Sequence, residues 1–404
     1  MHPIIEHENL YGAHNYAPLP VILTRGEGVY VWDDQGNRYL DMMSAYSAVS
    51  HGHCHPKLVS VLTEQAKKLA IVSRAFYTDL LGNFLQKACE AAKQDKALPM
   101  NTGAEAVETA LKAARKWAYT VKKVQPDKAE IIVCEGNFHG RTIAIVGMSS
   151  EPQYRSGFGP FPAGFKMIPF GDAEALRKAI TSNTAAFLVE PIQGEGGILV
   201  PPKGYLKECE KICRENNVLL ICDEIQTGMG RTGKFLACEH DDIHPDAVVL
   251  GKALGGGLLP VSMFLSRRDV MDVFTPGDHG STFGGNPLAS AVGAAALDVL
   301  FTENLIARAA ELGDYLRNRL ENIKSPLISE VRGRGLLVGL VINPRYHSAR
   351  EICLKLLKLG VLSKDTHGDV IRLAPPLVIT KEQIDTLIVA LTQVLSEVAA
   401  TLSV

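Results

Sequence analysis

Two charged residues stand directly after apolar runs, at positions where side chains could take part in chemistry. Asp223 follows the run 218–222, and Lys252 follows the run 248–251. Such runs predict strands buried on both faces, and in open α/β sheets ligands bind beyond the carboxyl ends of the strands. A buried charge there needs a partner or a purpose. Lys252 could pair with a neighbouring carboxylate or act as a Schiff-base nucleophile, and its position alone leaves both readings open.

A second pattern, Gly-Met-Gly-Arg-Thr-Gly at 228–233, matches GxGxxG and, together with Lys234, most of a P-loop. The P-loop requires Ser or Thr at the next position, where Phe235 stands. A dinucleotide-binding loop should join strand to helix directly, but residues 223–227 intervene and the segment after Lys234 lacks helical periodicity. This context disfavours a nucleotide site, although an NAD(P)-dependent oxidoreductase is kept as an alternative from a different class of enzyme.

Histidines and cysteines could bind a metal. His51, His53 and His55 would share one face of an extended strand, but Gly52 and Pro56 argue against a regular strand, so packing and loop hydrogen bonds are favoured. The eight cysteines form no CxxC pair, and several lie inside apolar runs. We expect no metal site, and free thiols in a reducing compartment.

The order of the elements predicts an α/β fold. Helical spacing of apolar residues over 102–122, between strand-like runs, predicts a mainly parallel central sheet with helices on both faces. Residues 20–40 resemble a small β unit, and a helix at 305–323, strands at 336–342 and 370–373 and a helix from Lys381 follow. We expect a large domain at 47–304 and a smaller α+β domain at 305–404, which residues 1–46 join. The strand-like runs of the large domain are 131–134, 166–169, 186–189, 218–221, 247–250 and 261–264.

Composition limits the possible partners. The 404 residues carry 42 Lys and Arg against 44 Asp and Glu, a formal net charge of −2, which argues against a surface that binds nucleic acid. The longest mostly apolar run, 289–301, is too short to span a bilayer, and the N-terminus has no targeting pattern. We expect a cytoplasmic protein without membrane or nucleic-acid partners.

Six short segments, in their order along the chain, make the sequence similar to the class III aminotransferases, which are pyridoxal-phosphate (PLP) enzymes of fold-type I. The resemblance covers nearly the whole chain. It implies the fold-type I architecture, a PLP cofactor, and transfer of an amino group from an amino acid to a 2-oxo acid. The segments are Asn-Thr-Gly-Ala-Glu-Ala at 101–106, Asn-Phe-His-Gly-Arg-Thr at 137–142, Glu-Pro-Ile-Gln-Gly-Glu at 190–195, Asp-Glu-Ile-Gln-Thr-Gly at 223–228, Gly-Lys-Ala-Leu at 251–254 and Ser-Thr-Phe-Gly-Gly-Asn at 281–286.

The resemblance also implies roles around the cofactor ring. Lys252 would join PLP covalently and move the proton during catalysis. Asp223 would pair with the pyridinium nitrogen and keep it protonated. Gln226 would contact the ring hydroxyl, and Phe138 would stack on the ring face.

The phosphate of PLP would bind at the start of the helix at 102–122. Thr102, Gly103 and Ala104 open this helix, whose free N–H groups and positive dipole end suit a dianion. By resemblance, Ser281 and Thr282 reach the phosphate from the neighbouring subunit. This implies a homodimer with shared active sites.

Substrate residues follow from similarity to family members that transfer the δ-amine of L-ornithine to 2-oxoglutarate, giving L-glutamate 5-semialdehyde and L-glutamate by a ping-pong route. The resemblance assigns the α-amine to Tyr16 and the α-carboxylate to Arg141, with Tyr46 as a wall of the pocket. Arg372 would bind the carboxylate of 2-oxoglutarate. Glu195 would pair with Arg372 in one half-reaction and move away in the other.

Two positions depart from those relatives. His139 stands where some have Trp, a change that we expect to be harmless. Gly196 follows Glu195 where many have Ala, a feature shared with acetylornithine aminotransferases. Acetylornithine and 4-aminobutyrate therefore remain as alternative amino donors within the family.

Overall fold

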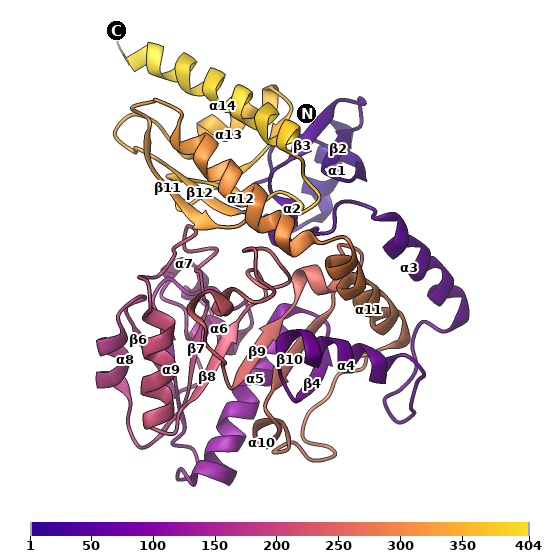
Figure 1. Cartoon of the computed structure of the whole chain (residues 1–404), viewed down its shortest axis with the longest axis vertical. Coiled ribbons are helices and arrows are strands. Elements are labelled where there is room, and N and C mark those ends of the chain that lie inside the picture. Colours follow the sequence, from indigo (N-terminus) through magenta and orange to yellow (C-terminus); the bar gives the residue numbers. More distant parts are fainter. Residues whose placement is uncertain (1, 403–404) are drawn as a thin grey trace.

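The computed structural model describes residues 2–402, and the side chains of residues 2–400. A seven-stranded sheet forms the centre of the larger part of the molecule (Figure 1), with strand order β4-β10-β9-β8-β7-β5-β6. Strands β6, β5, β7, β8 and β9 run parallel, whereas β10 is antiparallel to both β9 and β4. The expected mainly parallel sheet is confirmed, with one reversed strand. The strands are β4 (Lys96–Met100), β5 (Glu130–Cys134), β6 (Phe165–Ile168), β7 (Thr184–Val189), β8 (Leu219–Asp223), β9 (Ala247–Leu250) and β10 (Ser262–Ser266).

Both faces of this sheet are covered, which explains the near-continuous apolar runs. Successive strand residues point to opposite faces. In β8, Leu220 and Cys222 join one hydrophobic cluster, and Leu219 and Ile221 join another. The helices of the chain are α1 (Pro3–Tyr11), α2 (Ser44–Ser47), α3 (Pro56–Lys68), α4 (Leu81–Ala92), α5 (Gly103–Trp117), α6 (Ile143–Gly147), α7 (Pro152–Arg155), α8 (Ala173–Ala179), α9 (Tyr205–Glu215), α10 (Arg268–Met271), α11 (Pro287–Thr302), α12 (Leu305–Glu321), α13 (Ala349–Lys358) and α14 (Lys381–Leu402), with a π-turn η1 (Ala118–Lys122) and 3₁₀ turns η2 (Ala237–Asp241) and η3 (Lys252–Gly255).

The two ends of the chain build two smaller sheets together. One has the order β1-β2-β3-β13, where β1 (Leu23–Glu27), β2 (Tyr30–Asp33) and β3 (Arg38–Asp41) come from the N-terminal segment. Strand β13 (Val361–Leu362) lies parallel to β3, with Val361 opposite Leu40. The other sheet contains β11 (Ile328–Arg334), β12 (Leu337–Ile342), β15 (Val370–Leu373) and β14 (Lys364–Thr366), in that order. This pairing supports our proposal that residues 1–46 and 305–404 form the smaller domain, with 47–304 as the larger one.

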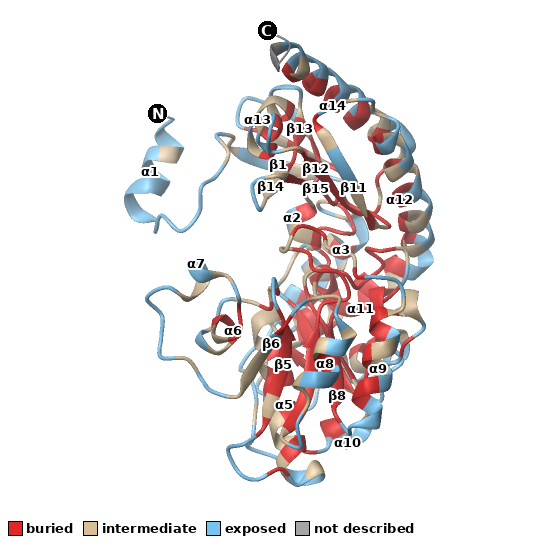
Figure 2. Ribbon diagram, turned by 90° about the vertical axis from the view of Figure 1, so that its left-hand side faces the viewer, coloured by how far each residue is buried: buried red, intermediate tan, exposed pale blue. Residues whose placement is uncertain are grey.

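The first helix stands apart from the rest of the chain. Helix α1 has no buried residue, and Figure 2 shows it mostly exposed, with one short intermediate section, and separated from the main body. At the other end, α14 is long and apolar enough over Lys381–Ala400 to span a membrane. However, Ile384, Leu387 and Leu391 on this helix are buried in the main hydrophobic cluster, as in a core helix of a globular protein.

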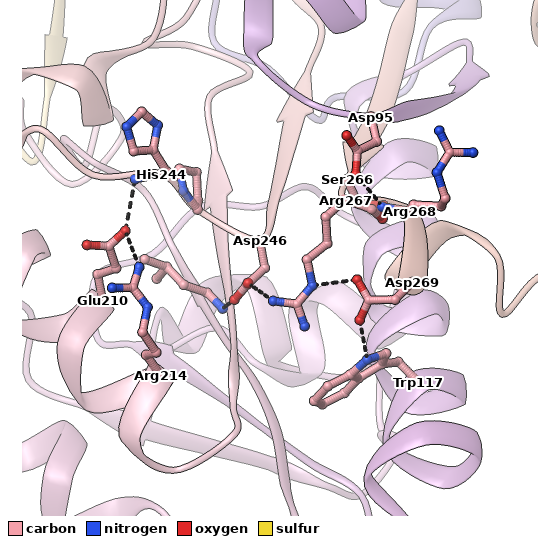
Figure 3. A network of polar contacts seen from close by, with 12 residues as sticks. Asp95, Trp117, Glu210, Arg214, His244, Asp246, Ser266, Arg267, Arg268 and Asp269 are labelled. Carbon is pink, nitrogen blue, oxygen red and sulfur yellow. Dashed lines mark hydrogen bonds and ion pairs between the residues drawn. The ribbon is translucent and has the colours of Figure 1, made fainter.

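The amino end of β9 is fixed by a polar network (Figure 3). The guanidinium of Arg267 bridges the carboxylates of Asp246 and Asp269. Asp246 also accepts the backbone N–H of Leu220 at 2.7 Å, and Asp269 accepts the indole N–H of Trp117 on α5 at 3.3 Å. This network thus connects β8, β9, α5 and the residues that follow β10. It lies at the end of the sheet opposite the strand ends that carry Asp223 and Lys252.

Candidate active site

A cavity of about 200 Å³ opens where β8 and β9 end. Most of its lining comes from strand ends and from the loops that follow them. This position agrees with the rule that ligands bind beyond the carboxyl ends of strands in such sheets. The lining residues are Gly103, Phe138, His139, Gly140, Glu190, Glu195, Asp223, Ile225, Gln226, Thr227 and Lys252.

Lys252 enters the cavity from a strained backbone. Strand β9 ends at Leu250, and Lys252 begins the turn η3 with a φ of +46°, in the left-handed region that non-glycine residues rarely adopt. Such strain persists only where the surroundings hold it, and it concentrates at functional sites. Burial lowers the pKa of Lys252 from 10.5 to about 8, although the charges of Glu195 and Asp223 oppose this shift. At pH 7 about a tenth of the amine is therefore unprotonated and nucleophilic, far more than for an ordinary lysine.

Asp223 is held in place by its neighbours at the end of β8. Its Oδ1 accepts the backbone N–H of Ile225 at 3.1 Å, and its Oδ2 lies 2.7 Å from Nδ1 of His139. Both side chains are almost completely buried. Burial alone would lower the pKa of His139, but the hydrogen bond and charge of Asp223 outweigh it and raise that pKa. The pair therefore keeps a proton between the histidine and the carboxylate.

Glu190 and Glu224 directly follow the neighbouring strands β7 and β8 but differ in their surroundings. Glu224 is fully satisfied, because it accepts the hydroxyl of Thr227 and the backbone N–H groups of Ala237 and Cys238. Glu190 accepts the backbone N–H of Phe138 at 3.0 Å and lines the cavity. Burial raises the pKa of Glu190 to about 7. Glu224 thus has a structural role, whereas Glu190 faces the cavity.

Gln226 leaves its polar atoms available to a ligand. Both its amide nitrogen and its amide oxygen are buried without a hydrogen-bond partner among the described residues. The amide lies directly against Gly194, where a Cβ would be only 1.4 Å from Oε1 of Gln226, so the position requires glycine. Buried polar groups are normally paired, so this amide is a candidate for ligand contact.

At the edge of the cavity an arginine pairs with a glutamate beneath a tyrosine ring. Arg372 on β15 is 2% exposed, and its Nη1 lies 2.6 Å from Oε1 of Glu195. Burial alone would raise the pKa of Glu195, but the charge and hydrogen bond of Arg372 outweigh it and lower that pKa. The guanidinium carbon of Arg372 lies 5.0 Å from the centre of the Tyr46 ring. Lys364 donates to the Tyr46 hydroxyl at 3.4 Å.

Arg141 lies outside the cavity lining and is exposed. Its guanidinium carbon is 3.7 Å from the ring centre of Tyr154 and 5.5 Å from that of Phe138. The two rings meet edge to face, with their centres 5.9 Å apart. Stacking of this kind holds an arginine in one orientation while its donors stay free.

The start of helix α5 has a complete capping box. The Thr102 hydroxyl accepts the N–H of Glu105, and the Glu105 carboxylate accepts the N–H of Thr102. Gly103 lines the cavity, while Thr102 and Ala104 do not. The first N–H groups of a helix have no partner within it, so those of Gly103 and Ala104 can receive an anion.

Besides Arg141, Thr102, Ala104, Tyr46 and Arg372, three more of the expected site residues are absent from the cavity lining in the single chain. Tyr16 follows α1 and is 76% exposed. Ser281 accepts a hydrogen bond from Asn101 at 2.9 Å, next to α5, and Thr282 is exposed. The single chain thus does not bring Tyr16, Ser281 or Thr282 into the cavity.

Comparison with known proteins identifies the family to which a chain with this site belongs. The family model described as aminotransferase class-III matches residues 11–395. The chain belongs to the class III aminotransferase family.

Individual relatives of this family are similar over almost their full length. Ornithine aminotransferase 2 of Staphylococcus saprophyticus is 58% identical over 95% of this chain and 96% of its own. A structure of the ornithine aminotransferase from Toxoplasma gondii, with partial occupancy of PLP at its active site, has a TM-score of 0.96 and 47% identity over 98% of this chain and 94% of that one. Acetylornithine aminotransferase from Elizabethkingia anophelis has a TM-score of 0.89 and 50% identity over 98% of both chains.

Membership of the class III aminotransferases makes this chain a PLP-dependent aminotransferase of fold-type I, which acts on amino acids and 2-oxo acids. The NAD(P)-dependent oxidoreductase alternative is therefore wrong. The segment 228–233 lies in a loop between β8 and η2, where the Arg231 side chain is completely buried. It resembles a nucleotide-binding loop only in its glycine spacing.

The cavity of this class III aminotransferase fits PLP. The unpaired Gln226 amide and the buried Asp223 carboxylate supply polar contacts, Phe138 supplies an aromatic face, and Lys252 supplies an amine. The open N–H groups at the start of α5 suit a phosphate.

Sequence reasoning missed two residues of this site. We expected the change from Trp to His139 to be harmless and gave the residue no role, but it is the hydrogen-bond partner of Asp223. Glu190 belongs to a family segment but received no role, although it follows β7 as Asp223 ends β8. The rule that drew attention to Asp223 could have found Glu190. The sequence contains no comparable signal for His139.

Proposed function

We propose that the chain is an ornithine δ-aminotransferase, which converts L-ornithine and 2-oxoglutarate to L-glutamate 5-semialdehyde and L-glutamate. The observation that carries this proposal is the ion pair of Arg372 with Glu195, 2.6 Å long, at the edge of the cavity. An enzyme that accepts both a terminal amine and a 2-oxo acid needs an arginine that binds the carboxylate of the 2-oxo acid. The charge of this arginine must be neutralised by another group while the terminal amine is bound. The names of the relatives from Staphylococcus saprophyticus and Toxoplasma gondii support the same assignment.

Four residues would act on the cofactor ring. Asp223, held by His139, would keep the pyridine nitrogen protonated, and Gln226 would bind the ring hydroxyl with its unpaired amide. Phe138 would stack on the ring. When bound, PLP supplies an electron-withdrawing ring that makes the carbon bearing the amine acidic. Lys252 would hold the cofactor covalently and, once released, take and return the proton at that carbon through its Nζ.

The phosphate would bind at the start of α5, to the N–H groups of Gly103 and Ala104, with Thr102 beside them. We propose that Ser281 and Thr282 reach it from a second copy of the chain. In support, Ile71, Leu259 and Phe283 line an apolar groove beside Thr102, and Phe283 is 56% exposed. A homodimer that covers this groove would share its two active sites.

The α-amino acid end of ornithine would be held away from Lys252. Arg141, oriented by Tyr154, would bind the α-carboxylate, and Tyr16 would bind the α-amine. Tyr46 would close the pocket above Arg372. Because the segment that carries Tyr16 is exposed in the single chain, we propose that it is ordered by the homodimer.

Glu195 would act as a switch on Arg372. During the ornithine half-reaction no carboxylate lies near Arg372, and an unpaired buried charge would be costly, so Glu195 pairs with it. During the second half-reaction the α-carboxylate of 2-oxoglutarate would replace Glu195. We place the enzyme in the cytoplasm, where its product would cyclise to pyrroline-5-carboxylate and link arginine breakdown to proline or glutamate.

A second candidate, acetylornithine aminotransferase, is favoured by the 50% identity to the Elizabethkingia anophelis enzyme. Gly196, which is shared with acetylornithine enzymes, has a packing reason in this chain. A Cβ at this position would lie 3.1 Å from the backbone oxygen of Gly136 and 3.2 Å from Gln193. Its presence therefore says little about the substrate.

The test is a comparison of amino donors. The purified protein is supplied with PLP, 2-oxoglutarate and L-ornithine, N-acetylornithine or 4-aminobutyrate, and glutamate formation is measured for each donor. We expect kcat/KM for ornithine to exceed that for the other two by at least tenfold, with pyrroline-5-carboxylate as the product. A preference for N-acetylornithine would overturn the proposal in favour of the second candidate.

A further inference from the structure

The loop at 228–233 contains a buried cation that the cofactor and substrate roles do not use. Arg231 is 0% exposed, and no carboxylate of the described residues lies within 4.0 Å of its guanidinium. Burial lowers the pKa of Arg231 to about 9, and the more distant charge of Asp41 only partly opposes this. A buried charge without a counterion is normally disfavoured, so the hydrogen bonds of this side chain must justify its presence.

Those hydrogen bonds join three distant segments. Nη1 donates to the backbone oxygens of Leu336 and Pro375, and Nη2 donates to the hydroxyls of Ser44 and Ser50 at 3.1 and 2.9 Å. Ser44 belongs to the N-terminal segment, while Leu336 and Pro375 flank strands of the C-terminal sheet. The planar fork of arginine can reach four acceptors at once, which the single nitrogen of lysine cannot do in this geometry.

Ser44 and Ser50 bracket an unusual piece of backbone. Residues 44–47, which form α2, have φ values of +42°, +47°, +58° and +74°, and none of them is glycine. The left-handed conformation is unfavourable for each residue that is not glycine. Consecutive residues in this conformation therefore need contacts with other segments to stabilise them. The Ser44 hydroxyl donates to the backbone oxygen of Ala374, and the Ser50 hydroxyl donates to that of Ser47. The guanidinium thus contacts both serines whose hydroxyls hold this turn.

The turn determines where the Tyr46 ring lies. Tyr46 is the third of the four left-handed residues, and its ring faces the guanidinium of Arg372. If residues 44–47 returned to ordinary backbone angles, the ring could not remain in this place. Arg372, which contacts both the Tyr46 ring and Glu195, would then lose the ring as a neighbour, and the position of both charged side chains would change.

We propose that Arg231 is a positioning residue for substrate selectivity, which holds the left-handed turn at 44–47 and thereby keeps Tyr46 against Arg372. The link to selectivity rests on the proposed function, in which Arg372 binds the 2-oxo acid. The clamp on the turn does not depend on it.

The experiment compares Arg231→Lys, which keeps the charge, with Ser50→Ala, which removes one acceptor and leaves the guanidinium in place. Ser266→Ala is the matched control, because Ser266 is also a completely buried serine whose hydroxyl bonds to a backbone oxygen, at the far edge of the sheet (Figure 3). Hydrogen exchange of residues 44–50 in the holoenzyme reports on the turn. Steady-state kinetics with ornithine and 2-oxoglutarate report on selectivity.

We expect exchange across 44–50 to accelerate at least tenfold in Arg231→Lys and about threefold in Ser50→Ala, with no change in Ser266→Ala. The KM for 2-oxoglutarate should rise about tenfold in Arg231→Lys while kcat changes less than threefold. Adding Ala45→Gly should recover at least half of the KM change on a logarithmic scale, because glycine adopts positive φ without the steric cost.

Unchanged exchange at 44–50 in both variants would overturn the clamp. Faster exchange with an unaltered KM, or failure of Ala45→Gly to recover it, would overturn the link to selectivity. If Arg231→Lys does not fold, Ser50→Ala and Ser44→Ala decide the question by the same criteria. If the protein does not use ornithine, the proposed function fails while the exchange result still tests the clamp.

Discussion

Replacement of Glu195 by Ala tests the switch on Arg372 most directly. Two unit charges 2.6 Å apart interact by about 6 kcal/mol at an effective dielectric constant of 20, before desolvation is considered. Removing one partner of a buried pair typically costs about 3–5 kcal/mol. The Glu195 side chain is 26% exposed, so water can replace part of the interaction, and we expect the lower end of this range. About 3 kcal/mol corresponds to roughly a 150-fold change.

The loss should appear in only one half-reaction. With Glu195→Ala, Arg372 is unpaired when the δ-amine of ornithine is bound, so the rate constant of the ornithine half-reaction at subsaturating substrate should fall about 100-fold. The half-reaction with 2-oxoglutarate should change less than about threefold, because the substrate carboxylate replaces Glu195 there. Transfer of the α-amine should increase, since Arg372 is free to bind an α-carboxylate.

Single-turnover stopped-flow absorbance of each half-reaction provides the assay. Glu195→Gln keeps an acceptor without the charge and should show an intermediate loss. Glu311→Ala removes the partner of Lys381 in an exposed pair of the same length, 2.6 Å, and it should leave both half-reactions unchanged. Equal losses in the two half-reactions of Glu195→Ala would refute the switch.

Three further perturbations follow from the site. His139→Ala removes the partner of Asp223, and a hydrogen bond to a charged group is worth about 1.5–3 kcal/mol, so PLP affinity measured by equilibrium dialysis should fall about tenfold or more; unchanged affinity would contradict this. In the apoprotein the pKa of Lys252 is about 8, against 10.5 for an unperturbed lysine. Between these pH values the native state therefore binds fewer protons than the unfolded state. The free energy of unfolding should rise with pH through that window, by about 2–3 kcal/mol. Urea denaturation at pH 7.5 and 10.5 should show this rise in the wild-type apoprotein but not in Lys252→Met, and an equal rise in both would argue against it. Phe283→Asp places a charge in the apolar groove beside α5 and should produce monomers in sedimentation velocity together with weaker PLP binding, whereas an intact dimer would place the subunit interface elsewhere.

The inner strands of the large sheet could be predicted because burial on both faces leaves a continuous apolar run. Every run expected between residues 131 and 264 forms a strand. Strand β4 was not predicted, since it contains Lys96 and Pro99 and has no such run. It pairs only with β10 at the edge of the sheet, where a proline is tolerated.

Part of the site could be predicted for the same reason. Asp223 and Lys252 are visible in the sequence as charges that follow buried strands, and the structure brings both to one cavity. The contacts of His139 with Asp223 and of Tyr46 with Arg372 join residues more than 80 positions apart. No local spacing reports on such contacts. Tyr16 is exposed in the single chain, so its place in the substrate pocket stays a proposal.

The pairing of β3 with β13 has a consequence for how the protein is made. The partner of Leu40 on that edge is Val361, so the N-terminal sheet lacks its fourth strand until nine-tenths of the chain has been synthesised. Contacts between such distant segments form slowly, because a very long loop must close first. The central sheet, whose strands lie between residues 96 and 266, can assemble earlier on the ribosome. During that interval the unpaired edge of β3 can form hydrogen bonds with strands of other chains. Chaperone binding would therefore be most useful at this edge.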